Sequence, residues 1–289
     1  MQTTHGKTWW LMVILVVLVL NMVGCSVARI GELNTETTSI ELQEADAVWA
    51  GIETSSGNLT IRGGANSSLL DGEFTYNVPE WRPEVNYTVN GNQGKLIVRR
   101  PDCDFYFVTD DVRCEWDLAL NDEALLDLRV ETGSADGRLD LAGLSLTRLG
   151  IHTSSGEFQI DGAGEQRVLR TVEVDTMSGD IALELTGDYA SLVSVDAQTS
   201  SGDLTFDLTG SWAHDLDVTI DSAAGHVTLL LPRDAGVSVT VDTSAGDVTA
   251  NGFIADGKTY VNNAPGSAPV TLNISVKTSS GNVILGLAE

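Results

Sequence analysis

Acidic residues that follow a recurring glycine turn are the first candidates for chemistry in this sequence. Phrases such as IHTSSGEFQI (151–160) and AQTSSGDLTF (197–206) place an acid directly after Ser-Gly. Carboxylate oxygens are ligands that Ca²⁺ prefers, and equivalent positions of stacked strands lie about 4.8 Å apart. A row of such acids could therefore bind Ca²⁺, with the candidates Glu157, Asp180, Asp203 and Asp247. The alternative is a solvated charged surface. We favour the surface and assign no metal site, because the denser Gly-Gly-x-Gly-x-Asp pattern of calcium-binding repeats is missing.

Cysteine and histidine supply no further reactive centre by spacing. Cys103 and Cys114 are separated by ten residues and are predicted to form a disulfide that closes a local loop. Two thiolates without a neighbouring His do not complete a zinc site. The four histidines are predicted to be solvated surface residues, since no spacing pairs two of them: His5, His152, His214 and His226.

Motifs of catalysis and cofactor binding are also missing from the sequence. It contains no nucleophile elbow, H-E-x-x-H, P-loop or dinucleotide-binding glycine pattern. An alternative interpretation is an enzyme that cleaves acidic polysaccharides. The charge of residues 151–289 disfavours it, because 19 acids against five bases would repel that substrate. We therefore predict no enzyme activity, no catalytic residue and no cofactor.

The first 25 residues have the layout of an export signal. Lys7 precedes an unbroken apolar run over residues 9–20, and Met22-Val23-Gly24-Cys25 resembles the bacterial lipoprotein box. In that box the cysteine is acylated, so Cys25 is the predicted lipidation site. An uncleaved membrane anchor is the alternative. Both interpretations tether the remaining chain to the extracytoplasmic side of the cell membrane, with residues 1–24 as signal peptide and 25–44 as a lipid-anchored linker.

The charge balance excludes one class of partner. The 289 residues include 16 Lys and Arg against 41 Asp and Glu, which gives a net charge of -25. Phosphate binding requires a basic stripe, and no Lys/Arg cluster occurs. We predict no nucleic-acid partner.

A repeated phrase dominates the second half of the chain. Its glycines are Gly156, Gly179, Gly202, Gly225 and Gly246, at spacings of 23, 23, 23 and 21 residues. Apolar residues alternate on both sides of each turn, which indicates strand, turn, strand. One such unit cannot bury its apolar face alone, whereas stacked units can. Residues 130–289 are thus predicted to form an all-β, stacked-repeat solenoid, similar to a single-stranded β-helix.

The repeat predicts details of each unit, or rung. Glycine is expected to supply a positive φ at the turn. The phrase at 276–285, which follows an expected loop at 262–266, is expected to form the last rung that closes the stack. The residue three positions before the glycine in most phrases is expected to form a hydroxyl ladder: Thr54, Thr132, Thr153, Thr176, Thr199, Ser222, Thr243 and Thr278. Asp180, Asp203 and Asp247 are expected on the outside of adjacent turns.

Residues 45–129 are predicted to form a separate N-terminal β region, which contains nine of the 17 aromatic residues and half of the 12 Arg; within it, residues 63–129 break the period. Short runs at 73–78, 85–89, 95–99 and 116–120 indicate strands joined by Pro, Gly and Asn turns. We expect an irregular antiparallel β cap at the N-terminal end of the solenoid, with Trp116 in its core.

Several of these segments resemble a known bacterial family. The stretch SSLLDGEFTY, then KLIVRR and EWDLALNDEALLDLRVETGSADGRLDLAGLSLTRLGIHTSSGEFQI, is similar to the toast-rack family, and the TSSGD units are similar to the putative-adhesin domain. Both resemble extracytoplasmic domains of cell-wall-active antibiotic response proteins. The resemblance implies a stacked all-β fold at the envelope without established enzymatic activity. The Cys103–Cys114 pair and the long Gly133–Gly137 corner depart from the family pattern.

The leading functional interpretation is a membrane-anchored binding or adhesion module that contacts an envelope polymer or an envelope protein. The alternative that the resemblance suggests is an envelope-stress regulatory domain that docks on a membrane signalling protein; a scaffold is the third. No binding site is assigned from sequence. The exposed-aromatic candidates for contact are Trp81, Tyr87, Tyr106, Trp212 and Tyr260.

Overall fold

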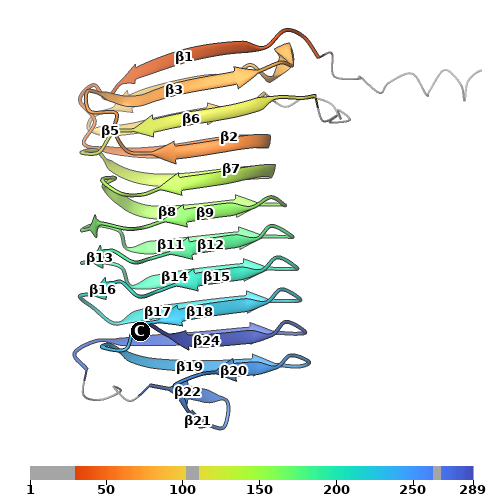
Figure 1. The fold of residues 1–289 in the computed structure, drawn as a ribbon. Helices are drawn as coiled ribbons and strands as arrows, with labels where there is room; N and C mark the ends of the chain where they lie inside the picture. Colours follow the sequence, from red (N-terminus) through yellow and green to blue (C-terminus); the bar gives the residue numbers. More distant parts are fainter. Residues whose placement is uncertain (1–29, 102–110, 263–267, 289) are drawn as a thin grey trace, which may run out of the picture.

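The protein is a β-solenoid whose rungs stack in one direction (Figure 1). The computed structural model describes residues 30–101, 111–262 and 268–288, which form 24 β-strands and one short 3₁₀ helix, η1 (Pro79–Trp81). The stack begins with β1 and ends with a hairpin of β21 and β22 (Figure 1). The predicted all-β solenoid is confirmed.

Each regular rung contributes one strand to each of two walls. Parallel pairing in register dominates both walls, and the strands of the N-terminal end and the β21–β22 hairpin add antiparallel pairs. In spatial order the first wall contains β4 (Glu84–Asn90), β5 (Gln93–Arg99), β2 (Ala47–Arg62), β7 (Leu125–Asp140), β8 (Leu146–Thr153), β11 (Thr171–Thr176), β14 (Ser194–Thr199), β17 (Leu216–Ser222), β23 (Thr271–Thr278), β19 (Gly236–Thr243), β22 (Thr259–Val261) and β21 (Ile254–Asp256).

The second wall shares the two long strands β2 and β7, which turn the corner between the walls. In spatial order it contains β1 (Asn34–Glu41), β3 (Ser68–Tyr76), β6 (Cys114–Leu120), β2, β7, β9 (Phe158–Asp161), β12 (Ile181–Glu184), β15 (Leu204–Asp207), β18 (Val227–Leu231), β24 (Val283–Leu287) and β20 (Val248–Ala250). A third, short sheet closes three rungs with β10 (Glu165–Gln166), β13 (Asp188–Tyr189) and β16 (Ser211–Trp212).

The core lies between the walls and is filled by alternate residues of each strand. Val174, Ala197 and Ile220 stand in register on β11, β14 and β17, and each is at most 1% exposed. Phe206 fills the equivalent space from the second wall at 0%. Because a parallel ladder places equivalent positions above one another, period-two alternation in the sequence becomes a continuous apolar column.

The predicted hydroxyl ladder is confirmed by the strand register, which orders it Thr54, Thr132, Thr153, Thr176, Thr199, Ser222, Thr278 and Thr243. Thr176, Thr199 and Ser222 are buried, and each accepts a hydrogen bond from the backbone N–H of the glycine three residues later at 2.8–3.1 Å. Each also donates to the carbonyl oxygen of that glycine. The hydroxyl therefore satisfies a buried backbone donor and shapes the corner.

The corner glycines of the regular rungs are required by close stacking. A methyl group in place of a hydrogen on Gly202 would lie 1.9 Å from the carbonyl oxygen of Gly179, and on Gly225 it would lie 1.8 Å from that of Gly202. Among the described corners of this kind a positive φ occurs only at Gly57 and Gly156. The expected positive φ is therefore found at Gly57 and Gly156 and is wrong for the other corner glycines. At those corners a Cβ is excluded because it would collide with the backbone of the neighbouring rung.

Residues 271–287 do not form the end of the stack, so that prediction is wrong. β23 pairs with β17 on one side and with β19 on the other, and β24 lies between β18 and β20. The terminal rung is instead β19–β20, and the β21–β22 hairpin pairs with β19. One residue difference fits this order: the inward Leu285 of β24 is fully buried, whereas its register partner on the terminal strand β20 is the smaller, half-buried Ala250.

The N-terminal end contains the expected antiparallel strands, β1–β3–β6 and β4–β5. β5 and β6 in turn pair parallel with β2, so this region continues the solenoid. Trp116 is buried and packs edge-on against Phe74 at 5.4 Å, as predicted for a core residue. The domain boundary predicted between residues 129 and 130 falls within β7, whose pairing with β2 continues across it.

Candidate functional site

The acids after the corner glycines accept hydrogen bonds from the next rung. The Asp180 carboxylate accepts the Asp203 backbone N–H at 2.9 Å, and the Asp203 carboxylate accepts the His226 N–H at 2.8 Å. Asn282 and Asp247 continue the row, since His226 Nδ1 accepts the Asn282 N–H and Asn282 Oδ1 accepts the Asp247 N–H. Each side chain thus satisfies a backbone donor where strand pairing pauses at the corner.

This row corrects the expected geometry of the calcium candidates. Two rungs, which carry His226 and Asn282, separate Asp203 from Asp247, so the three aspartates are not on adjacent turns. Within the described ranges, no group of three or more His, Cys, Asp or Glu side chains could hold a metal ion. Calcium binding by Asp180, Asp203 and Asp247 stays the untested alternative to a solvated surface, and backbone capping is the role that the contacts give Asp180 and Asp203.

We expect Asp203→Ala to lower the free energy of unfolding by about 1 kcal/mol, because it leaves the His226 N–H without its acceptor. Asp203→Asn keeps an acceptor oxygen and should cost much less. Thermal denaturation of both variants, with and without Ca²⁺, measures the difference. A Ca²⁺-dependent rise in the wild-type Tm that both variants lose would contradict the capping role.

The aromatic candidates are not brought together. Trp81 is 2% exposed and lies 4.2 Å from the Arg100 guanidinium at the N-terminal end. Trp212 is half-buried on β16 and stacks on Tyr189 at 4.9 Å. Tyr87 is half-buried and donates to the Leu42 carbonyl. Tyr260 is half-buried on β22 at the opposite end.

Other candidates lie wholly or partly outside the described residues: residues 1–24, Cys25, Cys103 and Tyr106. Cys114 is buried at the start of β6, and burial raises the pKa of its thiol. It forms no disulfide with any residue that the structure describes, and its pairing with Cys103 stays a prediction. His214 and His226 are exposed, as predicted, whereas His152 is half-buried on β8.

A long apolar helix is absent from the part of the chain that the structure describes: none there could cross a membrane.

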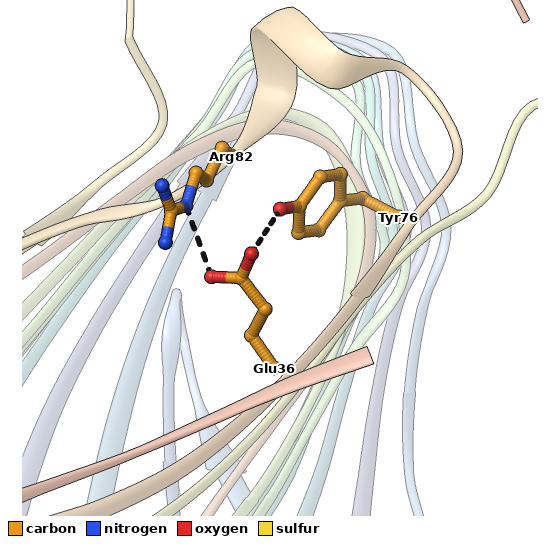
Figure 2. Close-up of polar contacts among 3 residues, drawn as sticks. All are labelled: Glu36, Tyr76 and Arg82. Carbon is orange, nitrogen blue, oxygen red and sulfur yellow. Dashed lines mark hydrogen bonds and ion pairs between the residues drawn. The ribbon is translucent and has the colours of Figure 1, made fainter. Parts of the chain in front are cut away.

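A groove of about 500 Å³ opens at the N-terminal end between β1, η1 and β4. Figure 2 shows its polar cluster, in which Glu36 accepts the Tyr76 hydroxyl at 2.8 Å and the Arg82 Nε–H at 3.0 Å. The hydrogen bond from Tyr76, and then the bond and charge of Arg82, lower the pKa of Glu36. Glu36 is thereby held as a carboxylate with both oxygens occupied, which suits a structural anchor for β1 and not a general acid.

The Glu36 cluster predicts acid sensitivity of β1. Since the folded pKa of Glu36 is lowered, its contribution to stability is present above its ordinary pKa, near 4.5, and is lost as the pH falls below that value. Glu36→Gln should therefore destabilise the β1 pairing at pH 7, and its difference from wild type should be smaller at pH 3. Hydrogen exchange of the β1 amides at both pH values measures this. A difference that persists at pH 3 would contradict the charge-dependent role.

The family follows from comparison with known proteins. The family model described as the N-terminal domain of toast_rack matches residues 29–176, about half of the chain. The chain belongs to the toast-rack family. The matched part of this toast-rack protein includes both long strands, β2 and β7, and extends through β11. The resemblance stated from the sequence is confirmed.

One solved structure shares the fold of this toast-rack protein with a TM-score above 0.5, and others match less closely. A crystal structure of a putative cell adhesion protein from Clostridium sporogenes matches with 21% identity, 89% coverage of this chain, 100% of that chain and a TM-score of 0.51. A putative adhesin from Bacteroides fragilis matches with 14% identity, 88% and 97% coverage and a TM-score of 0.41. A putative adhesin from Parabacteroides distasonis matches with 11% identity, 88% and 97% coverage and a TM-score of 0.43. No curated protein matches the chain.

Sequence reasoning missed one aromatic residue of the toast-rack region. Trp49 lies on the outward side of β2, and its indole contacts the Lys95 ammonium, 5.1 Å from the ring centroid. The signal was present in the alternation, because Val48, Ala50 and Ile52 are buried and Trp49 must then face outward.

Proposed function

We propose that this toast-rack protein is a non-catalytic binding module, tethered to the extracytoplasmic side of the cell membrane, that contacts a polymer of the bacterial envelope. The proposed module has a rigid stacked scaffold, and a predicted export signal precedes this scaffold in the chain. The name of the Clostridium sporogenes structure, a putative cell adhesion protein, supports the same class of function.

One observation carries the proposal: outward side chains of the walls recur in register. On the first wall Asp175, Gln198, Asp221 and Lys277 form one exposed row from β11 to β23. Neighbouring strands place such groups about 4.8 Å apart. A regular array of hydrogen-bonding groups can contact several units of a repeating polymer at once, and weak contacts then add through multivalency.

The tether is supported by the residues before the solenoid. Lys7, the apolar run at 9–20 and Cys25 resemble an exported lipoprotein. The predicted linker at 25–44 is too long, because β1 begins at Asn34 within it, so only the residues before Asn34 can link the membrane to the stack. Cys25→Ala should release the protein from the membrane fraction, as measured by cell fractionation. Unchanged membrane retention would contradict lipidation and favour the uncleaved anchor.

Co-sedimentation tests the binding function. Purified residues 26–289 are mixed with insoluble cell-wall sacculi and with intact cells, at low and physiological salt, with and without Ca²⁺. We expect saturable pelleting that resists salt. Absence of pelleting under every condition would overturn polymer binding and favour the regulatory alternative, whose membrane partner could be sought by cross-linking in cells.

A further inference from the structure

An indole lies flat on the outward side of the first wall, near its N-terminal end. Trp49 is half-buried on β2 and covers Gly51, its same-side neighbour two residues later. A methyl group on Gly51 would lie 2.5 Å from the Trp49 ring, so glycine leaves the space that the ring occupies. The other face of the ring, here called the platform, lies toward the exposed Lys95 ammonium, whose nitrogen is 5.1 Å from the ring centroid, so a ligand that stacks on the indole must move this flexible side chain aside.

Two cations flank the platform. Lys95 stands opposite Trp49 on β5, and Arg129 stands opposite Gly51 on β7. Neither forms an ion pair with any residue in the described ranges, whereas Arg99 and Arg148 on the same wall pair with Glu84 and Glu173. Lys95 and Arg129 thus keep charge available for a ligand.

Glycine recurs beside the second cation. Gly150 of β8 stands opposite Arg129, and a methyl group there would lie 3.8 Å from the Arg129 Nε. Glycine in the interior of a strand weakens the sheet, and it often marks a place where a ligand approaches the backbone closely. The space above Gly51 is filled by the Trp49 ring, so Gly150 is the position that lowers the surface beside Arg129.

The acids around the platform limit what it can bind. Asp127 stands between Trp49 and Arg148 in the register, and it offers an acceptor for hydroxyl groups. Glu53 and Glu131 stand opposite each other, two residues after Gly51 on β2 and after Arg129 on β7. At physiological ionic strength the acids of distant rungs are screened beyond about 8 Å, so the nearest charges dominate.

We infer that Trp49, Lys95, Arg129 and Asp127 form a binding patch for a saccharide that carries a carboxylate or phosphate group. The sugar ring stacks on the indole, its acidic group meets Lys95 and Arg129, and a hydroxyl donates to Asp127. The inference rests on the proposed function and names the ligand class of that function. One patch binds weakly, and a polymer bound by several copies of the protein binds tightly.

Calorimetric titration of the purified full-length protein in detergent tests the patch. The probes are a galacturonic acid hexasaccharide, a phosphorylated maltohexaose and the neutral maltohexaose. We expect at least one acidic probe to bind more tightly than maltohexaose, and the stronger acidic probe identifies carboxylate or phosphate as the recognised group. Failure of both acidic probes to bind would overturn the inference.

Variants locate the binding. Trp49→Ala should weaken the acidic probe roughly tenfold, and Trp49→Phe should weaken it less because a ring remains. The Lys95→Ala/Arg129→Ala double variant should lose the preference for acidic over neutral saccharide. Arg170→Ala, an exposed cation directly before β11 of the same wall, is the matched control and should bind like wild type. Equal affinity of Trp49→Ala and wild type would overturn the inference.

Pelleting with sacculi separates this inference from the proposed function. If wild type and Trp49→Ala pellet equally, the patch is overturned and polymer binding stands. If wild type does not pellet but binds the acidic probe in a Trp49-dependent way, polymer binding at the wall is overturned and the patch stands. Loss of pelleting in Trp49→Ala, with unchanged Tm, supports both.

Discussion

Gly225→Ala is expected to lower the free energy of unfolding by about 3 kcal/mol or more, which corresponds to a fall in Tm of at least roughly 6 °C. The new methyl group would lie 1.8 Å from the Gly202 carbonyl oxygen. That oxygen belongs to the stacked backbone of the neighbouring rung and cannot rotate away like a side chain. The corner must therefore separate from its neighbour, which loosens the hydroxyl contacts of Ser222. Thermal and denaturant unfolding followed by circular dichroism measures the loss.

Gly286→Ala is the matched control. A methyl group on Gly286 would lie 3.6 Å from the nearest side-chain atom, a carbon of Leu230, and the residue has no positive φ. We expect its Tm to stay close to that of wild type. Equal stability of the two alanine variants would show that the glycine column is not held by stacking distance.

Val283→Asp is expected to cost about 4 kcal/mol or more and to leave much of the protein unfolded or aggregated. Val283 lies on β24 between Val227 and Val248 and is 0% exposed, so the carboxylate would have no route to water. Val248→Asp, its register partner on the terminal strand β20, starts half-exposed and should cost far less. Soluble yield and Tm of the two variants measure the contrast.

The same pair of variants tests the order of the rungs. If residues 271–287 formed the end of the stack, Val283 would lie at the edge and Val248 in the interior. Val248→Asp would then be the more damaging change, and that result would contradict the inserted position of β23 and β24.

The sequence predicts the regular part of this fold well because identical positions become neighbours. Once Thr176, Thr199 and Ser222 are aligned by their glycines, stacking in register follows from burial of the alternating apolar residues. The cap residue Trp116 was also predictable, since it stands in a run of alternating apolar residues in a segment that breaks the period.

The order of the last rungs could not be predicted from the repeat. The phrases at 241–250 and 276–285 are nearly interchangeable in the first wall, where Val241 and Val276 occupy the same position. Two features distinguish the observed order: the larger inward residue Leu285 of β24, where β20 has Ala250, and the hairpin pairing that covers β19. Both features matter only when the two possible orders of the last rungs are compared, and the spacing of the repeat does not reveal either of them.

The candidate site was predicted less well for a similar reason. An acid after a corner glycine looks the same whether it binds an ion or accepts a backbone N–H from the next rung. Only the register shows that Asp203 faces the His226 amide. The aromatic candidates were chosen by residue type alone. Trp49 was missed because its proposed role in binding depends on the glycine beneath its ring and on cations of two other strands.

The inserted rung constrains how the chain can fold during synthesis. In the regular rungs, paired corners are 23 residues apart in the sequence, so each new unit can dock on the one made just before it. β23, which pairs with β17, lies 56 residues further along the chain, and β19 is synthesised before β23. β19 and β20 must therefore wait, or dock on β17 and β18 and later be displaced. The final third of the stack is a non-local assembly that closes last, although the rest grows in chain order.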